Sequence, residues 1–96
     1  MKAIAEITQS PLFAEQKKKL HKNRIKDLDE AIRTVVKEAE TGHLKTGDLS
    51  GIRVYKFQSM QEQVLLAYEV VENHLCLYAF GTHENFYRKL KKYLDR

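Results

Sequence analysis

Apolar side chains recur at three- and four-residue steps through one stretch of the chain, and this spacing predicts an amphipathic helix with a single apolar stripe. Gly42 follows the stripe, and glycine readily takes the left-handed backbone conformation that closes a helix. We therefore expect this helix to end at Gly42. The residues of the stripe are Ile25, Leu28, Ile32, Val35, Val36 and Ala39.

An earlier segment predicts a short strand followed by another helix. Residues 2–8 alternate between the two sides of an extended chain, which suits a strand. Ser10 can accept a hydrogen bond from an amide of the first helical turn, and Pro11 fits the first helical position because it has no amide hydrogen. A helix over residues 11–21 follows. So few residues separate the two helices that we expect them to pack as an antiparallel hairpin.

After Gly42 the pattern changes to a two-residue alternation, which predicts β-strands. Three runs rich in β-branched and aromatic residues occupy residues 52–58, 64–71 and 74–80, with short polar connections between them. The middle and last runs are apolar on both faces, as central strands covered by helices are.

Helical spacing returns in residues 82–96, with an apolar side that would face the sheet. The predicted order is β-α-α-β-β-β-α in one domain, residues 1–96. This order describes an α+β fold in which a helical hairpin and a C-terminal helix pack on a mostly antiparallel four-stranded sheet. The apolar residues of the last helix are Phe86, Leu90, Tyr93 and Leu94.

Charge is distributed unevenly along the chain. The net charge is +4, and residues 17–26 hold six cations and no anion, whereas residues 27–40 hold five carboxylates against two cations. A basic segment of this kind attracts nucleic acid or an acidic partner protein. A solvated helix face explains the same charges equally well.

Several classes of protein are disfavoured by what the sequence lacks. The single cysteine, Cys76, excludes an internal disulfide and fits a reducing compartment, so we expect a cytoplasmic protein. No apolar stretch approaches the length of a membrane span. Neither a phosphate-binding glycine loop nor a nucleophile elbow is present, and no metal or other cofactor is expected. The histidines, which lack zinc-ligand spacing, are His21, His43, His74 and His83.

The last predicted helix carries the most suggestive polar residues. His83, Tyr87 and Lys91 are spaced four residues apart and would form one line at the edge of the apolar side. An imidazole can transfer protons near neutral pH, a phenol can stack on a base, and an ammonium can neutralise phosphate. Alternatively, His83 caps the helix and Tyr87 packs at the sheet margin. Lys56, on a predicted strand, is either an edge residue that reaches water or a cation directed at phosphate.

Three segments together resemble the RelE/ParE superfamily of toxins, particularly the RelE- and YafQ-like ribonucleases. These are residues 44–56 (LKTGDLSGIRVYK), 65–68 (LLAY) and 81–87 (GTHENFY), and the resemblance covers nearly the whole chain in order. It implies a RelE-like fold and the toxin of a type II toxin-antitoxin system, held inactive by a cognate antitoxin in a complex that can form higher oligomers. Such toxins enter the ribosome and cleave mRNA without a metal ion.

The resemblance also implies roles for individual residues. The family's histidine or arginine before the last helix falls on His83, its helix aromatic on Tyr87 and a basic strand residue on Lys56. We expect His83 to transfer protons, Lys56 to stabilise charge on the reacting phosphate and Tyr87 to orient the nucleotide. The residues expected to contact mRNA or ribosomal RNA are Arg53, Arg88, Lys91, Lys17, Lys18, Lys19, Lys22 and Arg24.

Two alternatives stay open at this point. RelE-like enzymes often carry an arginine or an Asp-Trp pair before the strand that ends in tyrosine, whereas residues 61–65 (QEQVL) offer neither. ParE-type members of the superfamily inhibit DNA gyrase and need no ribonuclease site, and a basic domain without catalytic activity would need none either. The pair formed by His83 and Tyr87 favours the ribonuclease.

Overall fold

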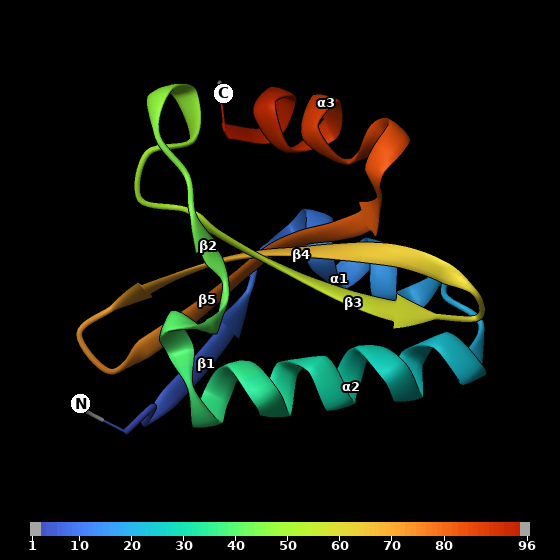
Figure 1. Ribbon diagram of the computed structural model, residues 1–96, viewed down its shortest axis with the longest axis horizontal. Coiled ribbons are helices and arrows are strands. Elements are labelled where there is room, and N and C mark those ends of the chain that lie inside the picture. Colours follow the sequence, from blue (N-terminus) through green and yellow to red (C-terminus); the bar gives the residue numbers. More distant parts are fainter. Residues whose placement is uncertain (1–2, 95–96) are drawn as a thin grey trace.

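The computed structural model describes residues 3–94, except for the side chains of Asp48, His83, Glu84, Asn85 and Tyr93. Within these residues, five strands form one sheet in the order β1-β5-β4-β3-β2 (Figure 1). The strands are β1 (Glu6–Gln9), β2 (His43–Leu44), β3 (Arg53–Ser59), β4 (Glu62–Val71) and β5 (His74–Thr82). The helices are α1 (Pro11–Lys18), α2 (Lys22–Lys37) and α3 (His83–Leu94), and short 3-10 turns occupy Ala39–Thr41 and Gly47–Leu49.

The predicted α+β class is confirmed, with one strand more than expected. β1 runs parallel to β5 and the other pairings are antiparallel. The added strand, β2, has only two residues, too few for an alternating pattern to reveal it. Ser10 caps α1 as predicted, since its hydroxyl accepts a hydrogen bond from the Phe13 amide at 2.9 Å. None of the helices within residues 3–94 is long and apolar enough to span a membrane.

α2 covers one face of the sheet and α3 covers part of the other, so the central strands are buried on both sides (Figure 1). Leu66 and Tyr68 of β4 face α2, whereas Leu65 and Ala67 face α3. A β-bulge on β5, opposite Ala67 and Tyr68, shifts the alternation of that strand. The predicted inward residues of α3 that are described are Phe86 and Leu90, which are both buried, and Leu94, which is half-buried.

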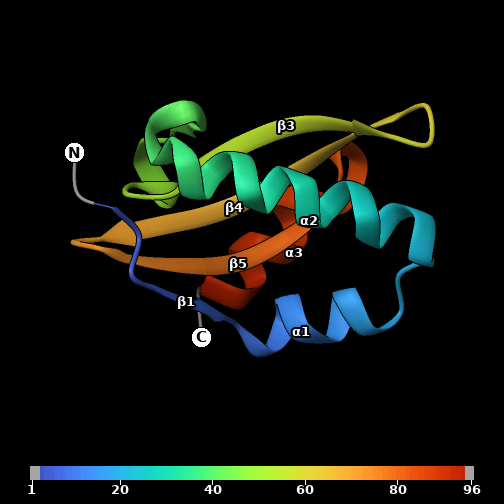
Figure 2. The ribbon, with the colours of Figure 1, turned by 90° about the horizontal axis from the view of Figure 1, so that it is seen from below.

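α1 lies along the edge of β5, beyond the point where β1 ends (Figure 2). The Gln16 side chain donates to the Phe80 carbonyl at 2.9 Å and accepts from the Phe80 amide at 3.0 Å, so it pairs with β5 as another strand would. α1 and α2 run antiparallel and are joined only by residues 19–21, as the predicted helical hairpin requires (Figure 2). α1 packs chiefly on β5 and α2 chiefly on β3, and an ion pair between Lys17 and Asp29 at 3.0 Å links the two helices.

The end of α2 also differs from the prediction. Its apolar stripe is as expected, but the helix ends at Lys37 with Glu38 as the C-cap, before Gly42 is reached. Gly42 has a φ of −76°, so it does not close the helix in a left-handed conformation. Glycine is instead needed here because the backbone lies very close to the Tyr68 side chain. A Cβ atom at Gly42 would overlap the Tyr68 hydroxyl and lie 2.8 Å from Cε1 of the same ring.

The hairpin between β3 and β4 turns through two residues with left-handed backbones, Met60 (φ 51°) and Gln61 (φ 67°). This conformation is unfavourable for residues other than glycine, asparagine and aspartate. α2 holds the adjoining end of β3. The buried Ser59 hydroxyl donates to an Asp27 carboxylate oxygen at 2.7 Å, and Arg24 donates to the Ser59 carbonyl at 3.3 Å. Interactions with α2 thus compensate for a poor turn sequence.

Candidate functional site

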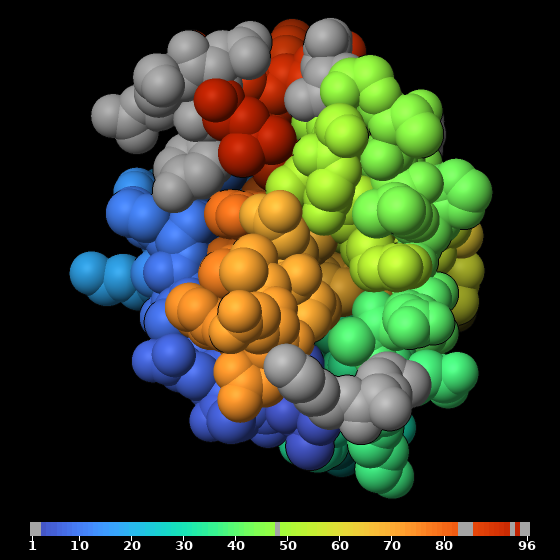
Figure 3. Space-filling model, turned by 90° about the vertical axis from the view of Figure 1, so that its left-hand side faces the viewer, coloured from blue at the N-terminus to red at the C-terminus, as the bar shows by residue number. Residues whose placement is uncertain are grey.

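The segment between α2 and β3, which we call the β2 strap (residues 39–46), lies beside the sheet at the C-terminal end of α2 (Figure 1). On the surface shown in Figure 3, the chain that leads from this strap into β3 (green to yellow-green) lies next to α3 (red). Residues that are far apart in sequence therefore share one side of the molecule.

The pairing of β2 with β3 fixes which side chains of the strap face α3. His43 is the antiparallel partner of Val54, so the two side chains lie on the same face of the sheet. Val54 is buried in the cluster under α3, and Lys56 is two residues further along the same strand. The Lys45 amide donates to the Ile52 carbonyl at 2.8 Å and continues the ladder by one more step. His43, Lys45 and Lys56 thus all face the α3 side.

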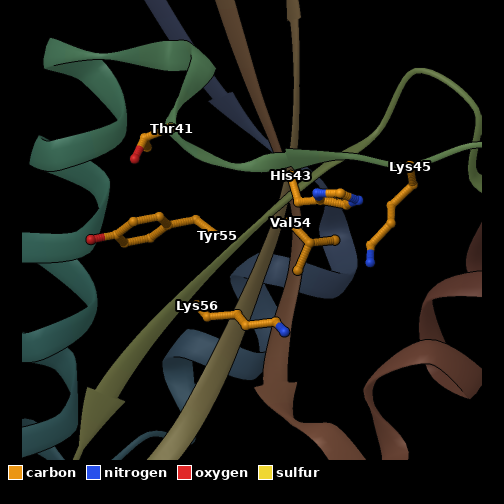
Figure 4. Close-up of a pocket in the computed structure, with 6 residues that line it drawn as sticks. All are labelled: Thr41, His43, Lys45, Val54, Tyr55 and Lys56. Atoms are coloured by element: carbon orange, nitrogen blue, oxygen red, sulfur yellow. The ribbon is translucent and has the colours of Figure 1, made fainter.

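These residues line an open pocket of about 430 Å³. In Figure 4 the ammonium groups of Lys45 and Lys56 point toward the same side of Val54, and the His43 imidazole extends toward Lys45. Tyr55 points the other way, toward α2. Among the residues whose side chains the structure describes, no carboxylate forms an ion pair with Lys45 or Lys56. A pocket with two ammonium groups and an imidazole is suited to bind an anion such as phosphate.

Tyr87 connects α3 to this pocket. The Lys45 ammonium lies 5.5 Å from the centre of the Tyr87 ring, within range of a cation–π interaction. The ring is half-buried, and its edge-to-face contact with Phe86, at 5.0 Å between centroids, anchors it on the core. An aromatic ring fixed beside the Lys45 ammonium could stack on a base whose phosphate lies in the pocket.

The strap is held in place from the sheet side by Tyr68 and Arg53. The buried Tyr68 hydroxyl donates to the Ala39 carbonyl at 2.7 Å and accepts from the Gly42 amide at 2.9 Å. Arg53 donates to the carbonyls of Gly42 at 2.8 Å and Glu40 at 3.3 Å. Burial raises the pKa of the Tyr68 phenol above its usual range, although the hydrogen bond from Gly42 and the charge of Arg53 partly oppose this. The hydroxyl therefore stays protonated and able to donate.

The structure brings only some of the predicted site residues together. Lys56 and Tyr87 belong to the pocket region, and Arg88 and Lys91 are exposed on α3. Arg53 is only half-exposed and its guanidinium binds backbone carbonyls of the strap, on the face away from Lys56. His83 begins α3, but its side chain lies outside the described residues. The catalytic and RNA-binding roles of all these residues stay predictions.

The basic run of residues 17–26 lies at the other end of α2 from the strap (Figure 2). The run includes the first turn of α2, and residues 27–37 of the helix separate it from the strap by about 16 Å along the helix axis. Three of its cations are already paired with carboxylates: Lys17 with Asp29, Lys19 with Glu15 at 3.4 Å, and Arg24 with Glu62 at 2.7 Å. Lys18 and Lys22 are exposed. This run is a separate surface and does not line the pocket.

Sequence reasoning missed His43 and Lys45. Nothing in the sequence singles out His43, because the two-residue strand that orients it leaves no alternating pattern. The available signal was the segment that begins at Leu44 and carries part of the family resemblance. His43 directly precedes this segment, and Lys45 is its second residue. In the part of the chain that the structure describes, no cluster of three or more histidine, cysteine or carboxylate side chains could hold a metal ion.

The arrangement of the sheet and the helices is shared with a known class of small α+β proteins. The fold is similar to that of a chain in the crystal structure of the intact E. coli RelBE toxin-antitoxin complex, with a TM-score of 0.68. That match covers 82% of this chain and 96% of the other, at 15% sequence identity, so it establishes the fold alone. No curated protein sequence matches the chain significantly.

The family follows from the sequence itself. Residues 7–91 match the family of ParE-like toxins of type II bacterial toxin-antitoxin systems. The chain therefore belongs to this family and is a toxin of the RelE/ParE superfamily, as the three sequence segments predicted. The match includes β2, the pocket and most of α3.

Proposed function

We propose that this toxin is a metal-independent endoribonuclease that cleaves mRNA on the ribosome and so inhibits translation. The observation that carries the proposal is the pocket in which His43, Lys45 and Lys56 face the same side of the sheet, next to the Tyr87 ring. Two cations and an aromatic ring match the parts of a nucleotide that a ribonuclease must hold, a phosphate and a base.

The chemistry requires no group that these residues cannot supply. A ribose 2′-hydroxyl loses its proton to a base and attacks the adjacent phosphorus, and the 5′-oxygen leaves with a proton from an acid. The products are a 2′,3′-cyclic phosphate and a 5′-hydroxyl. Lys56 would stabilise the added negative charge on the phosphate, and Tyr87 would stack on a neighbouring base. His83 is proposed for proton transfer, and the His43 imidazole, which lines the pocket, is another candidate for this role.

The proposed partners follow from the family. The E. coli relative was crystallised with its antitoxin, and we propose that a cognate antitoxin likewise binds and inhibits this toxin, in a complex that can assemble into higher oligomers. An acidic, amphipathic antitoxin segment would complement the net charge of +4. Arg88 and Lys91 on α3, together with the exposed cations of residues 17–26, are proposed to contact RNA in the cytoplasm.

The test uses the purified chain and a translating, cell-free system with a defined mRNA. Cleavage is mapped by primer extension, and the new ends are analysed for a 2′,3′-cyclic phosphate. The variant Lys56→Gln removes the pocket charge from an exposed side chain, and Lys37→Gln removes an exposed lysine outside the pocket as the matched control. We expect cleavage with the wild type and with Lys37→Gln, and a large loss with Lys56→Gln.

Inhibition of DNA gyrase is the second candidate, because the matching family is that of the ParE-like toxins. The same purified chain is therefore tested for gyrase cleavage complexes on supercoiled DNA. Intact mRNA together with gyrase cleavage complexes would refute the ribonuclease proposal in favour of this candidate. Intact mRNA and unaffected gyrase, combined with harmless expression of the chain, would indicate a basic domain that only binds its partner.

A further inference from the structure

We propose that Tyr68 and Arg53 are positioning residues for the anion-binding pocket, and that they act by fixing the β2 strap that carries His43 and Lys45. This inference rests on the proposed function, because it concerns the same pocket. Neither residue lines the pocket. Their contacts are with the backbone of the strap, on the side opposite the pocket.

The strap needs such support because its own pairing with the sheet is minimal. β2 contributes two residues, whereas strands in proteins usually have five or six. Its side chains are exposed, so burial of apolar surface does not hold it either. Within the part of the chain that the structure describes, the strap is attached by the ladder to β3 with its extension at Lys45, by the contact of Lys45 with the Tyr87 ring, and by the hydrogen bonds of Tyr68 and Arg53.

These bonds act at the residue that determines where His43 points. The Gly42 amide donates to the Tyr68 hydroxyl, and the Gly42 carbonyl, which directly precedes His43, accepts from Arg53. With both sides of Gly42 fixed, the Cα of His43 is fixed, and so is the direction of the next alternate side chain, Lys45. A Cβ atom at Gly42 would overlap the Tyr68 hydroxyl, so the hydroxyl can come this close to the strap only because residue 42 is glycine.

Removal of the contacts should therefore weaken the pocket without any change to its own side chains. Tyr68→Phe keeps the buried ring and deletes the hydroxyl. Arg53→Lys keeps the positive charge but removes the guanidinium nitrogen Nη1, which donates to both carbonyls. Tyr78→Phe is the matched control, since the Tyr78 hydroxyl donates to Glu69 at 2.7 Å on another part of the sheet.

The experiment measures binding of inorganic phosphate to the full chain by NMR, through the ring signals of His43, which are assigned with a His43→Asn variant. We expect phosphate to shift these signals in the wild type and in Tyr78→Phe. In Tyr68→Phe, which deletes two hydrogen bonds, the signals should move before phosphate is added. The dissociation constant should rise at least about fivefold, the effect expected if one of these bonds contributes fully to the position of the strap. Arg53→Lys should give a smaller change in the same direction and serves alone if Tyr68→Phe does not fold.

The outcomes separate this inference from the proposed function. If the wild type shifts the His43 signals with phosphate and both Tyr68→Phe and Arg53→Lys bind as tightly, the positioning role is wrong while the anion site stands. An equal loss in Tyr78→Phe would also overturn it, because general loosening of the sheet would then explain the effect. If phosphate leaves the wild-type signals unmoved, the anion site fails and the positioning role fails with it.

Discussion

Replacement of Gly42 by alanine tests the packing of the β2 strap most directly. At a φ of −76° an added methyl group causes no backbone strain, and alanine would by itself stabilise the protein by about 0.4–1 kcal/mol through a less flexible unfolded chain. The methyl group would, however, overlap the Tyr68 hydroxyl and lie 2.8 Å and 2.9 Å from Cε1 and Cζ of a ring with no exposed surface. The contact with Tyr68 therefore decides whether Gly42→Ala stabilises or destabilises the protein.

The cost of this overlap has two parts. Overpacking against a buried ring costs about 1–3 kcal/mol, and disturbance of the two hydrogen bonds of the Tyr68 hydroxyl costs about 1 kcal/mol each. Together they amount to about 3–5 kcal/mol, which exceeds the entropic gain. For a chain of 96 residues this loss lowers the melting temperature by at least about 10 °C.

The assay is denaturant unfolding followed by circular dichroism, with Gly42→Ala, Tyr68→Phe and the double variant measured as a cycle. Because the phenylalanine lacks the atom that the new methyl group would overlap, the double variant should be more stable than additivity predicts, by about 1 kcal/mol or more. A Gly42→Ala variant as stable as the wild type would refute the close packing. Destabilisation with strictly additive effects would point to another role for the glycine, unrelated to the hydroxyl.

Three further predictions concern single residues. Lys56→Gln should reduce mRNA cleavage by about 10²–10³-fold, the usual effect of losing one charge-stabilising group. Because the Lys56 side chain is exposed, the free energy of unfolding should change by less than about 0.5 kcal/mol. Burial raises the pKa of the Tyr68 phenol in the folded state above the unfolded value of about 10. The protonated phenol should therefore stabilise the protein below that pH, and the free energy of unfolding should fall as the pH rises beyond it. Tyr68→Phe should reduce this alkaline loss, as measured by urea unfolding at pH 9 to 11. Ser59→Ala should cost about 1–3 kcal/mol in the same assay, because the buried hydroxyl binds Asp27, and an unchanged midpoint would contradict this.

The parts of the fold that depend on periodicity could be predicted from the sequence. The stripe of α2 and the doubly apolar strands β4 and β5 repeat long enough to define both the element and its buried side. The place where α2 ends could not be predicted, because the reason for Gly42 lies in Tyr68, 26 residues further along the chain. The position of α1 at the edge of β5 was hidden for the same reason, since it depends on the pairing of Gln16 with Phe80.

Only part of the candidate site could be predicted from the sequence, and the length of the element that carries each residue explains why. Lys56 and Tyr87 lie on long elements whose faces the sequence pattern determines, so their approach to one side of the sheet could be expected. His43 and Lys45 face the pocket only because a two-residue strand pairs with Val54. Arg53 was expected to contact RNA, but its observed partners are backbone carbonyls of the strap, which no sequence pattern indicated.

The turn between β3 and β4 has a consequence for the order in which the chain folds. Two non-glycine residues with left-handed backbones make a turn that does not close readily by itself, at a cost of about 1–2 kcal/mol for each residue. The contacts of Asp27 and Arg24 with Ser59 compensate only once α2 has formed and docked. We therefore expect this hairpin to form late in assembly, with its register imposed by α2 rather than by the two residues that join its strands.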